Sequence, residues 1–260
     1  MKLSVFGAGS WGTAMAHHLA RGGHEVLLWA REPEVAEGIN AEHRNPLFIS
    51  DLDLHPGIVA VDDLQAAARF ADLWLWVVPV QFSRSVMEKL SGDVRDEVVV
   101  VSASKGIETE TLRRMDEVAA ESMDLDGNRF CCLSGPTFAR EVVRGDPSAA
   151  VLACSDLERA TLLQEAFSDH HLRCYAGADL VGVELAGEVA VQVTVRAVAD
   201  RGHNGDRRAD RLAAADRVAR DQFEAALGGR HPESGPDPEK IPKRKYQAKV
   251  KGIGRKAKKK

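Results

Sequence analysis

The chain has few of the features that build disulfide frameworks, metal centres or membrane anchors. Only four of its 260 residues are cysteine, and none of these forms a Cys-x-x-Cys pair or has the spacing of metal ligands. We therefore predict reduced thiols in a cytoplasmic protein, and we expect no metal site. No apolar run approaches the ~18 residues of a membrane-spanning helix, so we expect no membrane span. No N-terminal signal is visible, because a strand pattern begins at residue 2.

Charge and lysine are distributed unevenly along the chain. Residues 188–260 hold 19 Lys and Arg against 10 Asp and Glu, a net charge of +9, which leaves −13 for residues 1–187. Lysine is absent between Lys105 and Lys240. This asymmetry predicts two parts of different character. The hydrophobic content of 44% gives the chain enough apolar side chains for a sizeable core.

A glycine motif near the start of the chain carries the clearest functional signal. An apolar strand pattern over 2–6 runs into Gly7-Ala8-Gly9-Ser10-Trp11-Gly12, and a helical pattern follows. The Gly-x-Gly-x-x-Gly spacing is typical of dinucleotide sites. Gly7 permits a tight turn, Gly9 admits the pyrophosphate, and Gly12 lets the helix pack on the strand. A glycine-rich turn without a ligand is the plain alternative, but the strand before the motif and the helix after it favour the dinucleotide site.

Strand and helix patterns alternate through the first half of the chain. Further apolar strands are predicted at 25–29, 59–61, 72–78, 97–101 and 130–133, and helices at 64–70, 81–90 and 109–122. The alternation predicts an α/β fold, a Rossmann-like doubly wound parallel sheet. In such a sheet, ligands bind beyond the carboxyl ends of the strands.

Residues after three predicted strands are therefore candidates for a site. Arg31 follows the second strand, where a guanidinium suits the 2′-phosphate of NADP, whereas Glu32 keeps NAD open. Lys105 follows the fifth strand and can reach an anion or a carbonyl, although an ordinary loop lysine is equally consistent with its position. The small residues and hydroxyls of Ser134–Ala139 suit a phosphate or substrate loop, but its Gly-Pro alone indicates only a turn.

Five segments, in this order, resemble the bacterial soluble NAD(P)-dependent glycerol-3-phosphate dehydrogenases. They are Gly7–Ala14, Val77–Pro79, Lys105–Glu108, Ser134–Ala139 and Gly182–Gly187. The resemblance covers about residues 1–187. It implies hydride transfer between NAD(P)H and dihydroxyacetone phosphate, which gives sn-glycerol 3-phosphate for phospholipid synthesis in the cytoplasm. Other Rossmann dehydrogenases of the hydroxyacid or ketopantoate type share the glycine motif, but Ser134–Ala139 argues against them.

The resemblance also implies roles for individual residues. It is compatible with a homodimer, and Arg31 slightly favours NADP over NAD as the cofactor. The implied cofactor contacts are Gly7, Gly9, Ser10, Trp11, Gly12, Arg31, Pro79, Lys105 and Ala139. The implied substrate contacts are Lys105, Gly135 and Thr137. Lys105 would supply positive charge where the carbonyl oxygen becomes an alkoxide.

The pattern breaks after Gly187. The family continues into Ala-Leu-Lys-Asn, whose lysine is the general acid/base, whereas this chain continues Glu188-Val189-Ala190-Val191. The expected proton donor is therefore absent. Only 12 of the 73 residues in 188–260 are Val, Leu, Ile or Phe, which is too few for a core of their own. We expect a family member whose C-terminal domain is truncated or replaced and whose turnover is low or nil.

We accordingly expect three parts in the chain. Residues 1–187 form the Rossmann-like domain with the start of a second domain, 188–230 a degenerate or replaced segment, and 231–260 a disordered basic tail. Lys240–Lys260 contains 11 basic residues and no acidic one. A disrupted reading frame is the favoured explanation of this composition. The alternative is a non-catalytic, dinucleotide-binding remnant with a basic tail that binds nucleic acid through charge.

Overall fold

The computed structural model describes residues 1–186. The expected boundaries near residues 187 and 230, and the expectations for the basic tail, lie outside this described part. The strands are β1 (Lys2–Phe6), β2 (Glu25–Trp29), β3 (Ile58–Val61), β4 (Leu73–Trp76), β5 (Val99–Ser102), β6 (Phe130–Ser134), β7 (Ser148–Cys154) and β8 (Leu172–Gly177). The α-helices are α1 (Ser10–Arg21), α2 (Pro33–Glu42), α3 (Leu64–Phe70), α4 (Val80–Met87), α5 (Met115–Met123), α6 (Ala139–Arg144) and α7 (Leu157–Phe167).

The eight strands form one sheet in the order β3-β2-β1-β4-β5-β6-β7-β8. Strands β1 to β6 pair in parallel, β7 pairs antiparallel with β6, and β8 is parallel to β7. The order reverses beside β1, and this topological switch point is where doubly wound sheets bind ligands. The predicted Rossmann-like fold is confirmed, and the antiparallel addition of β7 extends it.

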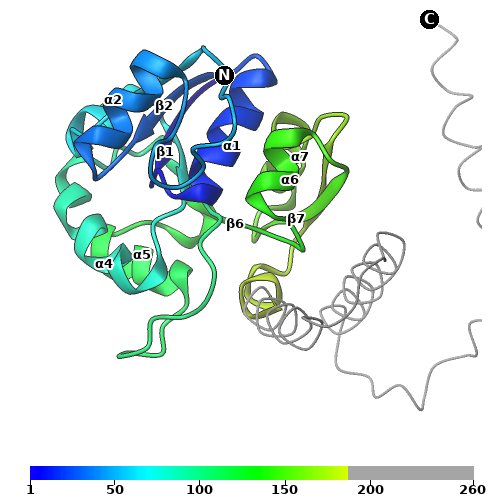
Figure 1. Ribbon diagram of the computed structural model, residues 1–260. Coiled ribbons are helices and arrows are strands. Elements are labelled where there is room, and N and C mark those ends of the chain that lie inside the picture. Colours follow the sequence, from blue (N-terminus) through cyan, green and yellow to red (C-terminus); the bar gives the residue numbers. More distant parts are fainter. Residues whose placement is uncertain (187–260) are drawn as a thin grey trace, which may run out of the picture. The chain divides into compact units, whose positions relative to one another are not determined.

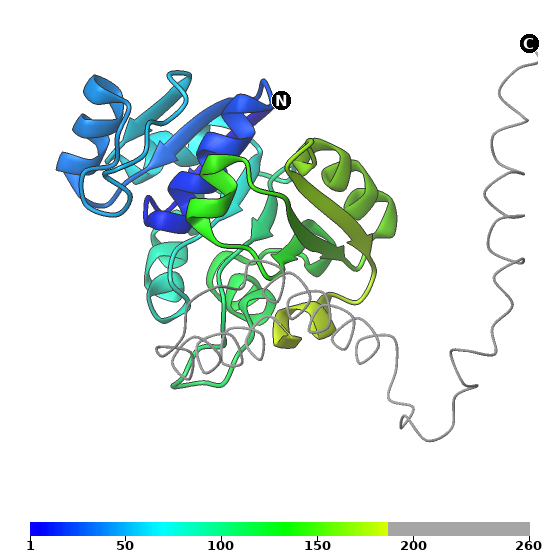
Figure 2. The same ribbon diagram turned by 45° about the vertical axis from the view of Figure 1, so that its right-hand side comes forward.

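Two apolar layers cover the two faces of the sheet, because neighbouring residues of each strand point to opposite sides. In β1, Val5 belongs to the layer that includes α1, α2 and α7, whereas Phe6 belongs to the layer with α3, α4 and α5. Phe6 lies between two buried tryptophans, with ring centroids 5.1 Å from Trp74 and 5.2 Å from Trp76. Figures 1 and 2 show the helices around the sheet, with α6 beside α1.

The structure corrects one predicted helix. The pattern predicted a helix over 109–122, but α5 begins only at Met115, and residues 103–114 form a long loop after β5. Side chains explain the difference, because Thr109 donates to Gln81 and Thr111 donates to Glu108. Leu112 has φ 58°, which a right-handed helix does not allow. The local Thr111–Glu108 bond and the long-range Thr109–Gln81 bond compete with helix formation and delay the helix start.

The remaining short elements complete the described chain. Two 3-10 helices complete the connections: η1 (Glu88–Asp93) precedes the loop to β5, and η2 (Gly127–Arg129) leads directly into β6. Residues 180–186 are helical. Within residues 1–186, no helix combines the length and apolar character needed to cross a bilayer.

Candidate functional site

The turn between β1 and α1 depends on glycine at two positions. Gly7 has φ +110°, and a Cβ there would lie 2.9 Å from the Val77 carbonyl oxygen. A Cβ on Gly12 would lie 1.8 Å from the Gly7 carbonyl oxygen. Both positions therefore exclude a side chain for reasons of fold alone, as the glycine motif predicted.

Gly9 differs from these two glycines because a Cβ at this position would meet nothing within 4 Å. Gly9 is the N-cap of α1, with ordinary extended φ and ψ of −66° and 178°, and no side chain caps this helix end. The first N–H groups of α1 thus remain available, and the positive end of the helix dipole favours an anion there. The open space at Gly9 fits the close approach of a pyrophosphate.

A loop distant in sequence holds this turn in place. Asn45 is fully buried, and its Nδ2 donates to the Ala8 carbonyl and to Thr13 Oγ1, both at 2.8 Å. The Ser10 hydroxyl donates to the Phe48 carbonyl at 2.9 Å. Sequence reasoning missed Asn45 because its partners lie more than 30 residues away and no local pattern marks such a bond.

Beside the glycine turn lies a pocket of about 390 Å³. Five predicted site residues line it together, from four separate parts of the sequence: Trp11, Pro79, Lys105, Thr137 and Ala139. Its other lining residues are Val77, Val78, Ala103, Ser104 and Phe138. Within the described residues, the Trp11 Nε1 is a buried donor without a hydrogen-bond partner. A bound group that carries a hydrogen-bond acceptor would supply that partner.

Lys105 reaches across this pocket toward the loop after β6. Its Nζ donates to the Gly135 carbonyl at 3.4 Å. The residue as a whole is exposed, but atoms around its ammonium partly desolvate it and lower its pKa. A Cβ on Gly135 would lie 2.6 Å from the Ala149 carbonyl oxygen, so this glycine lets the loop pack against β7. Thr137 is buried, and its N–H donates to the same Gly135 carbonyl at 2.9 Å.

Arg31 lies outside the pocket, beyond the end of β2. Its side chain is 72% exposed, and its guanidinium contacts the Glu32 carboxylate at 2.6 Å. The guanidinium and the carboxylate therefore occupy the same short segment. Arg31 suits the 2′-phosphate of NADP, and Glu32 suits the ribose 2′-hydroxyl of NAD. The segment is therefore compatible with both cofactors.

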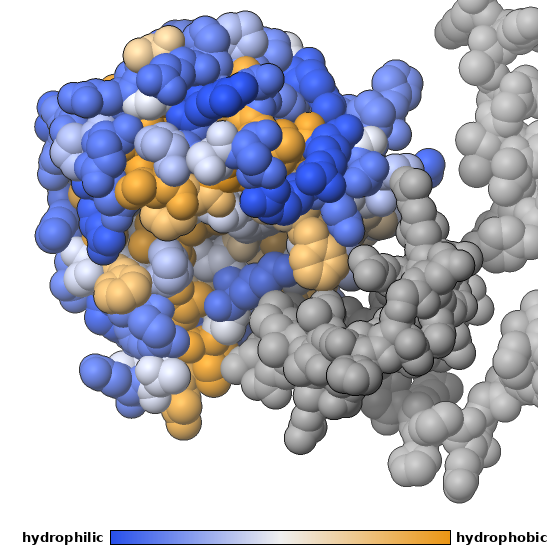
Figure 3. Space-filling model, viewed as in Figure 1, coloured by the Kyte–Doolittle hydropathy of each residue, from blue (hydrophilic) through white to orange (hydrophobic). Residues whose placement is uncertain are grey.

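The surface around the site is mixed in character. Figure 3 shows apolar side chains set among hydrophilic ones on one face of the molecule. Phe138, which lines the pocket, is 49% exposed, and Phe82 on α4 is 56% exposed. Among residues 1–186, no group of three or more His, Cys, Asp or Glu side chains is placed to hold a metal ion.

A family model and two relatives point to the same family. A family model described as the N-terminus of NAD-dependent glycerol-3-phosphate dehydrogenase matches residues 2–160. The chain is 45% identical over 197 residues to the glycerol-3-phosphate dehydrogenase [NAD(P)+] of Nitratidesulfovibrio vulgaris strain DP4, covering 76% of this chain and 60% of that protein. It is 42% identical over 186 residues to the second such enzyme of Salinibacter ruber, covering 71% and 54% respectively.

A solved structure gives the same result. The crystal structure of glycerol-3-phosphate dehydrogenase from Coxiella burnetii matches with a TM-score of 0.67 and 30% identity, covering 72% of this chain and 56% of that chain. The chain thus spans a little over half the length of these relatives. The family model covers more than half of the chain and includes the glycine turn and the pocket. The chain belongs to the NAD(P)-dependent glycerol-3-phosphate dehydrogenase family.

Proposed function

We propose that residues 1–186 bind NADP or NAD, and that the chain converts dihydroxyacetone phosphate to sn-glycerol 3-phosphate slowly or not at all. The relatives named above are NAD(P)+ glycerol-3-phosphate dehydrogenases. The observation that carries the binding proposal is the open space at Gly9 beside the uncapped start of α1. We expect the protein to work in the cytoplasm as a homodimer.

The binding proposal assigns a task to each part of the site. The N–H groups at the start of α1 hold the pyrophosphate, and the Ser10 hydroxyl lies beside them. Gly7 and Gly12 set the shape of the turn, while Trp11, Pro79 and Ala139 form walls of the pocket. Arg31 takes the 2′-phosphate of NADP when it leaves Glu32.

The substrate part of the proposal rests on the residues around Lys105. Lys105 and Thr137 line the pocket, and the Lys105 ammonium is directed at the Gly135 carbonyl. When bound, the nicotinamide supplies the hydride. The Lys105 ammonium stabilises negative charge that develops on the substrate oxygen, and the buried Thr137 fixes the loop that lines the substrate.

The proposal of weak turnover rests on the sequence after Gly187. The segment Glu188–Val191 stands where the family pattern has its general-acid lysine. Loss of a general acid typically lowers a rate by ~10²–10⁴-fold. Dinucleotide binding uses residues of the first 140 positions, so we expect it to survive this loss.

The test titrates NADPH and NADH fluorescence against the purified full-length protein and then follows NADPH oxidation with dihydroxyacetone phosphate. Saturable binding with oxidation at least 100-fold below that of a full-length relative supports the proposal. A Lys105→Met variant should weaken binding of dihydroxyacetone phosphate, and Lys89→Met, on the exposed 3-10 helix η1, is the matched control. Absence of dinucleotide binding, or turnover at the relative's rate, would refute it.

The alternative function uses the basic residues of Lys240–Lys260. Eleven positive charges without an acidic residue favour sequence-independent binding to nucleic acid. Such binding weakens steeply with added salt, because salt makes the release of counterions from the nucleic acid less favourable. Binding of duplex DNA by the full chain at low salt, lost on deletion of 240–260, would support this function. Equal binding before and after the deletion would exclude it.

A further inference from the structure

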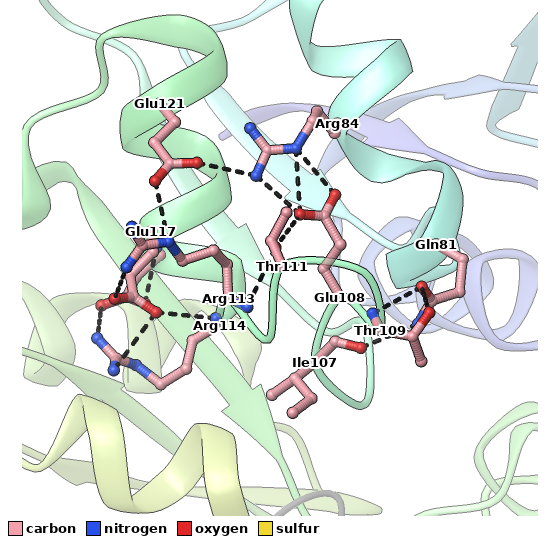
Figure 4. A network of polar contacts seen from close by, with 11 residues as sticks. Gln81, Arg84, Ile107, Glu108, Thr109, Thr111, Arg113, Arg114, Glu117 and Glu121 are labelled. Carbon is pink, nitrogen blue, oxygen red and sulfur yellow. Dashed lines mark hydrogen bonds and ion pairs between the residues drawn. The ribbon is translucent and has the colours of Figure 1, made fainter.

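Lys105 lies at the start of the loop 103–114, and this loop is held from outside by side chains of α4 and α5. Figure 4 shows the polar contacts around it. Gly106 follows Lys105 with φ +100°, so the backbone turns sharply directly after the lysine. The position of Lys105 in the pocket therefore depends on how the following residues are fixed.

Gln81 of α4 makes the first attachment. Its Nε2 donates to the Ile107 carbonyl at 2.9 Å. Its Oε1 accepts from the Thr109 N–H at 3.0 Å and from the Thr109 hydroxyl at 2.7 Å. One amide side chain thus binds the backbone on both sides of Glu108.

Glu108 makes the second and stronger attachment. Its side chain is only 9% exposed, and its carboxylate accepts from Arg84 Nε and from the outer nitrogen of the same guanidinium at 2.9 and 2.8 Å. Thr111 Oγ1 donates to the same carboxylate. The Arg84 guanidinium lowers the pKa of Glu108 and keeps it charged at neutral pH. Arg84 also contacts Glu121 of α5 at 2.9 Å, so the pair ties the loop to two helices.

Helix α4 also connects this attachment to the pocket wall that contains Pro79. Helix α4 begins at Val80, directly after Pro79, which lines the pocket. Next to Lys105, the Ser104 hydroxyl donates to the Val78 carbonyl at 2.6 Å. Gln81 and Arg84 lie one turn apart on α4, so both attachments share one rigid element with that wall.

We propose that Glu108 is a positioning residue that, by binding Arg84, sets where the Lys105 ammonium lies in the pocket. This proposal rests on the proposed function, because it concerns the lysine assigned to cofactor and substrate. The bidentate pair fixes both the distance and the orientation of the carboxylate, which a single point contact does not do. Loss of the pair leaves Gln81 as the remaining attachment of residues 107–109 to α4, and Lys105 then moves toward solvent.

The test measures Lys105 directly in the full-length protein. The rate of amine labelling at Lys105, followed by mass spectrometry across a pH series, gives the pKa of this amine and its accessibility. NADPH affinity is measured on the same samples by fluorescence. The variant is Glu108→Gln. The matched control is Asp72→Asn, which weakens the exposed Arg95–Asp72 pair at the start of β4.

The proposal predicts that Glu108→Gln raises the pKa of Lys105 toward its ordinary value, increases its maximal labelling rate at least ~3-fold, and weakens NADPH binding ~3–10-fold. Asp72→Asn leaves all three unchanged. Arg84→Lys, which keeps the charge but not the bidentate contact, shifts them in the same direction and covers the case in which Glu108→Gln fails to fold.

Two results overturn the proposal. One is a folded Glu108→Gln protein with wild-type Lys105 labelling. The other is equal effects of Glu108→Gln and Asp72→Asn. Absence of NADPH binding by the wild-type chain would instead refute the proposed function. The labelling data would still test the role of Glu108 in that case.

Discussion

Alanine substitution of Gly7, Gly9 and Gly12 distinguishes glycines that the fold requires from the one that ligand binding requires. At Gly9 the backbone already has φ −66°, and a methyl group meets no atom within 4 Å. Removing glycine lowers the entropy of the unfolded chain, a gain of about 0.4–1 kcal/mol. Replacing glycine by alanine at an N-cap costs a similar amount. The net change in stability for Gly9→Ala is therefore close to zero.

The other two substitutions disturb the fold. Gly12→Ala places a methyl group 1.8 Å from the Gly7 carbonyl oxygen, so α1 must move away from β1, and such overpacking costs about 1–3 kcal/mol or more. Gly7→Ala forces alanine to φ +110° and brings its Cβ within 2.9 Å of the Val77 carbonyl oxygen. A strained backbone of this kind costs about 1–3 kcal/mol, before any clash is counted.

Thermal unfolding followed by circular dichroism tests these values, with NADPH titrated on the same samples. Because 1 kcal/mol shifts Tm by ~2–4 °C in a protein of this size, Gly12→Ala and Gly7→Ala should each lower Tm by several degrees. Gly9→Ala should keep Tm within ~2 °C of wild type yet weaken NADPH binding at least ~10-fold, because its methyl group occupies the space of the pyrophosphate. Wild-type NADPH affinity in a folded Gly9→Ala protein would refute this placement of the cofactor.

Three further predictions concern stability. Burial raises the pKa of Glu184 to about 8 from an ordinary value of 4.5, so the unfolded chain ionises while the native state stays protonated. The free energy of unfolding should therefore fall as pH rises from about 4.5 to about 8. Glu184→Gln should remove this decline. In urea unfolding at pH 8 it should be more stable than wild type by ~2–4 kcal/mol. An equal dependence of stability on pH in both proteins would contradict the raised pKa of Glu184. Asn45→Ala should cost ~2–4 kcal/mol, because it removes two hydrogen bonds to buried groups of the glycine turn, and a Tm within 2 °C of wild type would disprove this. Asp63→Ala removes the N-cap bond to the Ala66 N–H and should lower the free energy of unfolding by ~1 kcal/mol, whereas Asp62→Ala, next to it, is the control.

The parallel strands were predictable because each is an apolar run with helical sequence on either side. The expected strand over 25–29 is confirmed as β2, and 59–61 and 130–133 lie within β3 and β6. Strands β7 and β8 were not predicted. The alanine-rich Ser148–Cys154 has weak strand propensity, and its partner across the antiparallel pair is β6. Long-range pairing, not local pattern, makes it a strand.

The site likewise contains some residues that the sequence predicted and others that it did not. The spacing of the glycine motif predicted the turn, since Gly7 and Gly12 are required by local geometry. The resemblance to a family indicated Lys105, Gly135 and Thr137. In the structure Lys105 and Thr137 line one pocket, and the Lys105 ammonium donates to the Gly135 carbonyl. Asn45 and Arg84, which hold the site in place, were not predictable from the sequence, because their hydrogen-bond partners lie 24 to 37 residues away. Only the folded chain shows such contacts.

One experiment on the purified protein tests cofactor binding and turnover together. NADPH fluorescence is titrated to saturation, and dihydroxyacetone phosphate is then added to the same sample. We expect saturable binding, weakened at least ~10-fold in Gly9→Ala, followed by little or no decay of the NADPH signal. No binding by the wild-type protein, or decay at the rate of a full-length relative, would contradict it.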